Sequence, residues 1–278
     1  MSNTSSNNNR ILVIGSNGKT GRRIYKKLTD KNIPVVGATY SGNPKFDWND
    51  SATWENVLNN INGVYISYYP DLAVPGAVKV IAAFCDLAVQ KGVQKLALLS
   101  GRGEEEAQQC EKIVMNAGVD FTIVRASWFC QNFSEGHFLE PVLAGEVALP
   151  VGNVGEPFVD ADDIADVAVA ALTEDGHSNK IYEVTGPRLL TFKDAIAEIA
   201  QATGKDIRFE QVSMDAYAAM LAEYGVPKDF IWLVTYLFTE VLDGRNESIK
   251  DGVQQALGRK PTDFSEYVRK AVATGVWG

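Results

Sequence analysis

A glycine-rich turn is the strongest sign of chemistry in this sequence. It reads Gly-Ser-Asn-Gly-Lys-Thr-Gly and joins a short β-branched run, Arg10 to Ile14, to a stretch with helical spacing. Glycines placed there allow a tight turn and let backbone N–H groups approach a pyrophosphate at the helix N-terminus. A turn needed only for packing is the weaker alternative, because the turn opens a strand–turn–helix unit. The pattern predicts a dinucleotide site at Gly15, Asn17, Gly18, Lys19, Thr20 and Gly21.

The residues after the second apolar run bear on which dinucleotide binds. About twenty residues beyond such a turn, an acid usually accepts hydrogen bonds from the ribose 2′-OH of NAD. This chain has Gly-Ala-Thr-Tyr-Ser at positions 37–41, with no carboxylate to repel a 2′-phosphate and no arginine to clamp it. Thr39 and Ser41 have hydroxyls that can donate to a phosphate. We therefore expect NADP as the cofactor, with NAD possible.

The catalytic pair typical of short-chain dehydrogenases is absent from the sequence. Only Tyr224 and Lys228 have the spacing of a tyrosine followed four residues later by a lysine, and the Gly and Pro between them prevent a helix that would align the pair. The acids at 160, 162 and 163 precede a helical pattern, where capping is the stronger interpretation. Three cysteines and two histidines without ligand spacing predict no metal site and no disulfide framework, and Cys85 is expected to be a buried thiol.

The order of apolar segments predicts the fold. Strands are expected at 10–14, 33–37, 63–69, 95–100, 120–125 and 180–184, and helices after the glycine turn and at 75–91, 104–117 and 162–172. Near-continuous apolar strands that alternate with helices indicate a buried parallel sheet. We therefore expect an α/β fold with a Rossmann-type doubly wound parallel sheet over residues 10–278. A small, mainly helical C-terminal lobe for the substrate is expected from about 130–155 and 186–278, and residues 1–9 are expected to be a disordered tail.

Charge and hydropathy restrict the partners. The net charge is −9, and the first 100 residues carry +5 whereas the remainder carries −14. An acidic chain repels nucleic acid, and a basic first segment suits a small polyphosphate, although both can simply be solvated faces. The longest apolar run, residues 230–238, is far shorter than the ~20 residues that span a bilayer. We expect a cytoplasmic protein with a small-molecule substrate, no nucleic acid and no membrane partner; the sequence leaves the oligomeric state open.

Several motifs together resemble one family. They are GSNGKTGRR from Gly15, Phe46-Asp-Trp with Thr53-Trp54 behind it, Val64-Tyr-Ile, Val124-Arg-Ala-Ser-Trp-Phe with Asn132, Pro157-Phe-Val-Asp-Ala-Asp-Asp-Ile, Arg245-Asn246 and Pro261-Thr-Asp-Phe. In this combination the chain resembles the NmrA-like atypical short-chain dehydrogenases, and most of all their ergot-alkaloid branch, which is festuclavine or agroclavine dehydrogenase-like. The resemblance runs from about Arg10 to the C-terminus.

The resemblance implies a site as well as a fold. It implies that Lys19 and Thr20 help to hold the pyrophosphate, that Ser41 lies near the adenosine ribose and that Asp47 and Trp48 border the adenine. It also implies that Tyr68, Ser100, Gly101, Arg102, Trp128 and Phe129 face the nicotinamide or the substrate. We expect Ser67 to bind the cofactor, and Tyr69, Trp128, Phe129 and Asn132 to bind the substrate; the alternative, that Trp128 and Phe129 only pack the floor of the cleft, stays open. Of these, Tyr68 and Arg102 are the candidate proton donors.

Two departures from the family pattern leave two functions open. Many catalytic relatives have a lysine four residues before Glu111, where this chain has Ala107, and many NADP-binding relatives have an arginine where Ser41 stands. Without a strong acid, hydride transfer to an iminium, a quinone or an activated conjugated carbonyl is favoured over reduction of a simple ketone. The alternative is a redox sensor that binds NAD(P) without turnover and acts through a protein partner.

Overall fold

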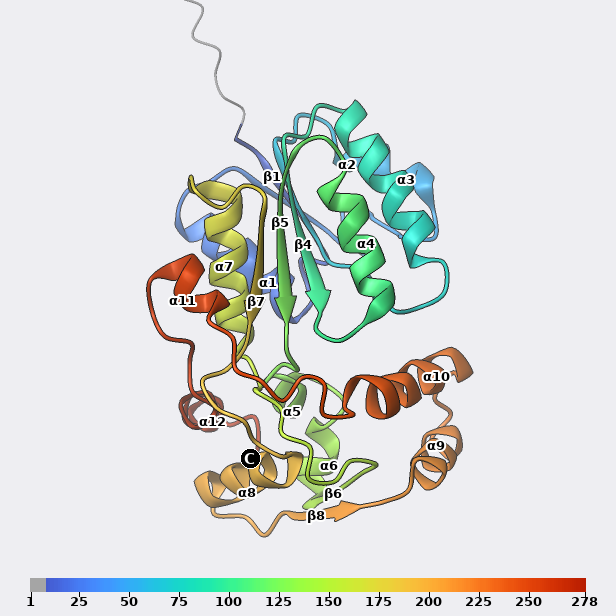
Figure 1. The fold of residues 1–278 in the computed structure, drawn as a ribbon, viewed down its shortest axis with the longest axis vertical. Coiled ribbons are helices and arrows are strands. Elements are labelled where there is room, and N and C mark those ends of the chain that lie inside the picture. Colours follow the sequence, from blue (N-terminus) through green and yellow to red (C-terminus); the bar gives the residue numbers. More distant parts are fainter. Residues whose placement is uncertain (1–8) are drawn as a thin grey trace, which may run out of the picture. The chain divides into compact units, whose positions relative to one another are not determined.

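The computed structural model describes residues 9–278 and divides them into two compact units. The sheet unit is the described part of Met1–Gly101 with Glu105–Arg125 and Ile164–Tyr182; the lobe unit is Arg102–Glu104, Ala126–Asp163 and Glu183–Gly278. The expected tail lies outside the described residues except for Asn9. Figure 1 follows the chain through its elements.

Six strands form one sheet, in the order β2-β1-β3-β4-β5-β7. The strands are β1 (Ile11–Ile14), β2 (Val35–Ala38), β3 (Gly63–Ile66), β4 (Lys95–Gly101), β5 (Asp120–Ala126) and β7 (Lys180–Val184). β1 pairs in parallel with β2 and β3, and β3 pairs in parallel with β4. Every residue of β1 and of β3 is buried, as expected for strands covered on both faces. The predicted Rossmann-type sheet is confirmed.

Helices cover both faces of this sheet (Figure 1). α3 and α4 lie on one face, and α1 and α7 lie on the other. Their bounds, with those of the short α2, are α1 (Lys19–Asp30), α2 (Trp54–Val57), α3 (Ala77–Gln90), α4 (Glu105–Met115) and α7 (Ala161–Thr173). α3 begins two residues after Pro75 and ends just before Lys91 and Gly92, so the predicted helix is confirmed within two residues at each end.

Two strand predictions were too long at one end. β2 begins at Val35 rather than at Ile33, because Pro34 has no N–H with which to extend the ladder. β3 ends at Ile66, so Ser67, Tyr68 and Tyr69 belong to the connection that follows the strand. Those three residues therefore lie beyond the carboxyl end of a central strand, which is where open α/β sheets bind ligands.

The lobe unit is mainly helical and has its own aromatic core. Its helices are α5 (Asn132–Glu135), α6 (Leu139–Ala144), α8 (Phe192–Thr203), α9 (Met214–Glu223), α10 (Lys228–Tyr236), a π-helical turn (Leu237–Val241), α11 (Gly252–Leu257) and α12 (Phe264–Ala273). The largest fully buried side chains in it are Phe133, Phe138, Phe158, Phe192, Phe264 and Trp277.

A two-stranded parallel sheet in the lobe unit is not predicted by the sequence. It pairs β6 (Glu146–Leu149) with β8 (Arg208–Gln211). β8 reads Arg-Phe-Glu-Gln and has a single apolar side chain, so no alternating pattern marks it. Pairing with β6 supplies the backbone hydrogen bonds that its own sequence does not indicate.

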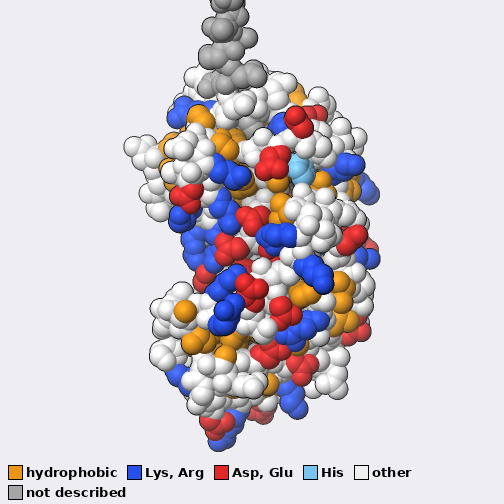
Figure 2. All heavy atoms as spheres, turned by 90° about the vertical axis from the view of Figure 1, so that its left-hand side faces the viewer, with side chains coloured by type: hydrophobic (Ala, Val, Ile, Leu, Met, Phe, Trp, Pro, Cys, Tyr) orange, Lys and Arg blue, Asp and Glu red, His pale blue; other side chains and the backbone are white. Residues whose placement is uncertain are grey.

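The face of the molecule drawn in Figure 2 carries charges of both signs. Figure 2 shows one face of the molecule with basic and acidic side chains interspersed among polar ones. Some of the lysines on α1 are paired on the surface, since Lys26 contacts Asp30 and Lys27 contacts Asp166, both within 2.7 Å. Among residues 9–278, no helix is both long enough and apolar enough to cross a membrane.

Candidate functional site

The glycine turn between β1 and α1 accepts only glycine at two of its positions. Gly15 has φ of +71°, in the left-handed region, and its carbonyl accepts a 2.8 Å hydrogen bond from the Gly18 N–H. A Cβ on Gly21 would lie 2.1 Å from the Gly15 carbonyl oxygen, so a side chain there would push the helix off the turn. The turn and the first turn of α1 are therefore packed backbone against backbone.

The N-terminus of α1 is open to an anion. α1 begins at Lys19, and within the described chain its N-cap, Gly18, makes no side-chain cap hydrogen bond and no acid lies in the first turn. The backbone N–H groups of a first helical turn have no partners inside the helix, and the helix dipole favours negative charge at this end. Asn17 and Gly18 are exposed and Lys19 is half-buried. These features fit the pyrophosphate of a dinucleotide.

The Thr20 hydroxyl is bonded to the sheet. The side chain is buried, and its Oγ1 accepts a 2.8 Å hydrogen bond from the Tyr65 hydroxyl of β3. The bond joins the first turn of α1 to the sheet. The expected contact of Thr20 with a pyrophosphate can come from its N–H group or from its own hydroxyl proton.

The connection after β2 holds the two hydroxyl residues expected near the adenosine. Thr39 is half-buried, and its carbonyl accepts hydrogen bonds from the N–H groups of Phe46 and Gly42 at 2.9 and 3.2 Å. Ser41 is exposed at the tip of the loop that these bonds close. Lys45 pairs with Thr39 in an isolated parallel bridge, and its Nζ lies 5.1 Å from the centre of the Tyr40 ring.

Lys45 is a candidate that the sequence reasoning missed. An arginine directly after the strand is the cation expected from the family pattern. In this chain the Thr39–Lys45 bridge places a lysine in the same loop, six positions after Thr39. A cation beside the ribose is what distinguishes a site for the 2′-phosphate of NADP from a site for NAD. The sequence signal is the lysine itself, but only the fold of the loop shows where it returns.

Asp47 and Trp48 differ in how much surface they offer. Trp48 is 7% exposed, its Nε1 donates a 3.1 Å hydrogen bond to the Ser67 carbonyl, and its ring packs among those of Phe46, Trp54 and Phe84. Asp47 is half-buried, and its carboxylate accepts from the Asn49 N–H at 2.9 Å. Trp48 is thus mainly a core residue, which leaves Asp47 as the more accessible of the pair.

Several predicted residues meet at the carboxyl edge of the sheet. Gly15, Ser67 and Gly101 stand at the ends of β1, β3 and β4, which are neighbours in parallel register. A Cβ on Gly15 would lie 3.7 Å from the Cβ of Ser67, so these two chain segments are in contact. The structure therefore brings the predicted pyrophosphate turn and the predicted nicotinamide side of β3 together.

The ring of Tyr68 packs against the ring of Trp48. The two rings lie 5.0 Å apart at an interplanar angle of 43°. Burial, together with the nearby Cys110, raises the pKa of the Tyr68 phenol, so the phenol keeps its proton at neutral pH. Tyr69, in contrast, is 77% exposed. Of the two, Tyr68 is the one with a fixed position at this edge.

Ser100 belongs to a buried charge network. Its Oγ donates a 2.6 Å hydrogen bond to Oε1 of Glu111, and Arg125 donates to both oxygens of the same carboxylate, at 2.9 and 2.5 Å. Glu111 is 1% exposed, so its charge depends on this bidentate partner. Ala107, one turn earlier on α4, is also buried. The serine hydroxyl is therefore oriented toward α4 by the charge pair.

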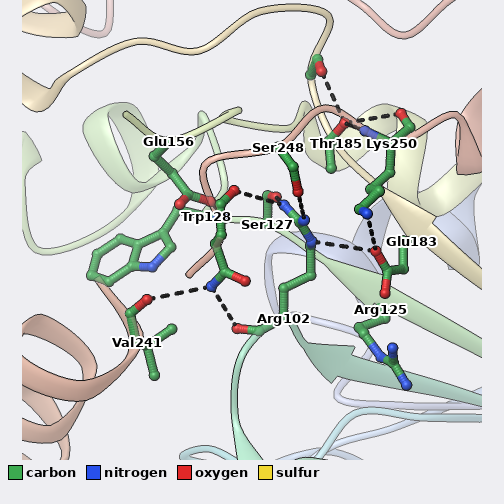
Figure 3. Close-up of polar contacts among 12 residues, drawn as sticks. Arg102, Arg125, Ser127, Trp128, Glu156, Glu183, Thr185, Val241, Ser248 and Lys250 are labelled. Atoms are coloured by element: carbon green, nitrogen blue, oxygen red, sulfur yellow. Dashed lines mark hydrogen bonds and ion pairs between the residues drawn. The ribbon is translucent and has the colours of Figure 1, made fainter. Parts of the chain in front are cut away.

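Arg102 lies at the centre of a polar cluster in the lobe unit (Figure 3). It is 6% exposed, and its guanidinium donates to the Ser127 and Ser248 hydroxyls, each at 3.0 Å, and to the Asn246 carbonyl at 3.3 Å. Glu183 lies 3.8 Å away. The side chain of Asn246 donates back to the Arg102 carbonyl at 3.1 Å. This expected proton donor therefore fastens residues 246–248 to the turn after β4.

The residues expected to bind the substrate include two adjacent aromatic residues of the lobe unit, Trp128 and Phe129. Trp128 is half-buried; its ring stacks on Phe138 at 6.3 Å and meets Phe192 and Phe238 at 5.4 and 5.3 Å. Phe129 is half-buried and pairs with Val159 in an isolated bridge. Asn132 begins α5, and its N–H donates to the Phe129 carbonyl at 3.0 Å.

Two interpretations of residues outside this set are confirmed, for Asp160 and for Cys85. Asp160 caps α7, because its Oδ1 accepts a 2.9 Å hydrogen bond from the Asp162 N–H. Asp163, which is also expected to serve the start of the helix, instead accepts a 2.6 Å hydrogen bond from the Thr262 N–H and pairs with Arg259 at 2.7 Å. Cys85 is a buried free thiol, and burial raises its pKa to about 12. Glu156, in contrast, is a buried carboxyl in the lobe unit that the sequence reasoning did not single out. Nothing in Gly-Glu-Pro-Phe marks it, since its burial comes from distant segments.

Comparison with known proteins agrees with this geometry. A scan against family models returned no match. The chain is 31% identical to agroclavine dehydrogenase of Claviceps fusiformis over 93% of this chain and 96% of that protein, and 29% identical to festuclavine synthase II of Penicillium roqueforti over 92% and 96%. The crystal structure of NADPH-dependent quinone oxidoreductase QOR2 from Escherichia coli, complexed with NADPH, has the same fold, with a TM-score of 0.79 at 20% identity over 94% of this chain and 99% of that one. The chain therefore belongs to the NmrA-like atypical short-chain dehydrogenase/reductase family, in the branch that includes the agroclavine and festuclavine dehydrogenases.

Proposed function

We propose that this protein is an NAD(P)H-dependent oxidoreductase that reduces a small organic acceptor by hydride transfer. The observation that carries the proposal is the turn from Gly15 to Gly21, which opens directly onto a helix N-terminus without a side-chain cap among the described residues. The named relatives support a dehydrogenase or reductase rather than a sensor, since agroclavine dehydrogenase is 31% identical over nearly the whole chain.

The bound cofactor supplies the hydride, and the protein binds it and orients the acceptor. Backbone N–H groups at the start of α1 hold the pyrophosphate, and Ser67 and Gly101, at the same edge of the sheet, face the nicotinamide. We assign the 2′-phosphate of NADPH to the loop of Thr39 and Ser41, with Lys45 as its cation. NADPH is therefore the preferred cofactor, with NADH accepted more weakly.

The acceptor class follows from the available acids. Arg102 is hydrogen-bonded to three groups within the lobe unit, and its guanidinium holds its proton too firmly to serve as an acid. Tyr68 keeps its phenolic proton but has a raised pKa, which makes it a weak donor. An iminium carbon needs no proton when it accepts hydride, and a quinone can take its proton from water. We therefore propose an iminium, a quinone or an activated conjugated carbonyl as the acceptor.

The decisive experiment follows oxidation of NADPH and NADH by the purified protein with a panel of cyclic iminium compounds, quinones and enones. Turnover with one class, and a lower KM for NADPH than for NADH, is the expected result. Cofactor binding is titrated in parallel. Tight NADPH binding without turnover across the panel would replace the enzyme with the sensor, and absence of binding would overturn both.

A further inference from the structure

Glu156 is a buried carboxyl with one unpartnered oxygen. Its side chain is 1% exposed, and its backbone exchanges hydrogen bonds of 2.8 and 3.0 Å with Leu190. Oε1 accepts a 3.1 Å hydrogen bond from the Trp128 N–H, whereas Oε2 is the one buried side-chain oxygen or nitrogen of residues 9–278 without a hydrogen-bond partner. A buried acceptor without a hydrogen bond costs free energy, and the cost is larger when the acceptor is charged. Protonation of this carboxyl removes the charge and therefore lowers that cost.

The surroundings of Glu156 leave both protonation states within reach. Burial raises its pKa to about 7, while the Trp128 amide, the Arg102 guanidinium and the Ser127 hydroxyl act in the opposite direction. Arg102 is the cation nearby, and its charge is shared with Glu183, 3.8 Å from it. Figure 3 shows Glu156, Trp128, Ser127 and Arg102 drawn together from the turn after β4 and the segments that follow β5 and β6.

The Trp128 indole is the group most directly connected to this carboxyl. Glu156 holds the Trp128 amide, and the Trp128 ring packs on Phe138, Phe192 and Phe238. Two other titratable groups lie close to these rings: the imidazole of His137 meets the Phe138 ring edge-on at 5.3 Å, and the Tyr217 ring meets the Phe238 ring edge-on at 5.7 Å. Burial raises the pKa of the Tyr217 phenol to about 12, so His137 is the group for which a control variant is needed near neutral pH.

We propose that Glu156 is a positioning residue for Trp128, and that gain or loss of one proton on its carboxyl changes how the Trp128 indole is held. Ionisation puts negative charge on both oxygens of the buried carboxylate, which draws it toward the Arg102 guanidinium and the Ser127 hydroxyl and moves the Trp128 amide with it. When Glu156 is protonated, the packing of the Trp128 ring sets the position of the Trp128 amide. The consequence for catalysis rests on the proposed function and on the expectation from the sequence that Trp128 faces the substrate.

Tryptophan emission as a function of pH tests the structural part without any substrate. The free wild-type protein should show a step in its emission maximum between about pH 6 and 8, centred near the pKa of about 7. E156Q keeps an acceptor for the Trp128 amide but cannot ionise, and it should lack the step. W128F, which removes the reporter, should lack it too, whereas H137Q should retain it.

Three outcomes would overturn the proposal that Glu156 titrates and changes how Trp128 is held. A wild-type protein without the step, an E156Q variant that keeps it, or an H137Q variant that loses it would each exclude Glu156 as the titrating group. If E156Q does not fold, the wild-type, W128F and H137Q titrations can still overturn the proposal, because a missing step in the wild type, or its loss in H137Q, excludes Glu156. None of them depends on turnover.

Steady-state kinetics tests the catalytic part. The KM for the acceptor should rise at least about three-fold in the wild type as the pH passes through the same range, and it should stay flat in E156Q, while the KM for NADPH behaves alike in both. Parallel acceptor profiles in the two proteins would overturn the positioning role. If the fluorescence step behaves as expected but no acceptor is reduced, the proposed function fails and the assignment of Glu156 to Trp128 stands.

Discussion

The guanidinium of Arg102 donates a 3.0 Å hydrogen bond to the hydroxyl of Ser248, which lies 146 positions later in the chain. Together with the bonds to Ser127 and Asn246, this bond lets Arg102 hold separate segments of the lobe unit together. Its buried cation has partners on three sides, so removing it leaves several polar groups unsatisfied at once.

We expect Arg102→Ala to lower the free energy of unfolding by about 2–4 kcal/mol, because it breaks a buried hydrogen-bonded charge cluster. Ser248→Ala, which removes one acceptor, should cost only about 1 kcal/mol. Urea denaturation followed by circular dichroism measures both. Wild-type stability in Arg102→Ala would contradict the structural role.

The glycine turn should determine cofactor affinity. Gly15→Ala with Gly18→Ala places a Cβ at a φ of +71° and another 3.2 Å from the Gly15 carbonyl oxygen, so the backbone N–H groups move away from the pyrophosphate. We expect the Kd for NADPH to rise about ten-fold or more, equivalent to about 1.4 kcal/mol. Titration by NADPH fluorescence measures it.

Gly118→Ala is a matched control for that double variant. Gly118 also has a positive φ, +82°, and no atom lies within 4 Å of a Cβ built on it. It stands between α4 and β5, at the opposite edge of the sheet from the turn. It should reproduce the backbone strain without the loss of affinity; equal weakening in both proteins would mean that strain, rather than the pyrophosphate site, is responsible.

Lys45 should determine the preference for NADPH over NADH. Lys45→Ala removes the cation that we place beside the 2′-phosphate, so we expect the Kd for NADPH to rise by about ten-fold, with that for NADH unchanged. Lys26→Ala is the control, because Lys26 is an exposed lysine of the same unit that pairs with Asp30. Equal effects on the two cofactors would move the 2′-phosphate elsewhere.

The stability of the fold should fall as the pH rises through the titration of Glu156. Its pKa in the folded protein is about 7, above the ordinary value of 4.5, so the folded chain binds more protons than the unfolded chain between those values. Stability from this group is complete below about pH 4.5 and is lost as the pH rises to 7 and above. The total is about 3 kcal/mol.

Glu156→Gln should remove that dependence, because an amide does not titrate. The difference in free energy of unfolding between the variant and the wild type should therefore grow in favour of the variant from pH 5 to 8. Denaturation midpoints at several pH values measure it. A constant difference across that range would show that Glu156 is already ionised in the folded protein at acidic pH.

The sheet was predictable because its signals are local. Alternation of apolar strands with helices, together with Pro75 before α3 and Gly92 after it, places the elements to within a few residues. The glycine turn was predictable for the same reason, since Gly15 and Gly21 are constrained by atoms only a few positions away.

The environments of the candidate residues were not predictable, because they are made by distant segments. Trp48 reads as a candidate for the adenine pocket until Phe84 and Trp54 enclose its ring. Arg102 is a candidate proton donor from its sequence, and only the structure shows its hydrogen bond to Ser248. Glu156 carries no signal at all, since its burial and its bond to Trp128 depend on how the lobe unit packs.

The chain passes between the two units five times, after residues 101, 104, 125, 163 and 182. The strand β7, at the edge of the main sheet, is therefore synthesised only after residues 126–163 of the lobe unit. A nascent chain that stops at residue 125 has β5 as an open edge and lacks α7. No single cut separates the units, so no contiguous fragment of the gene encodes either unit alone.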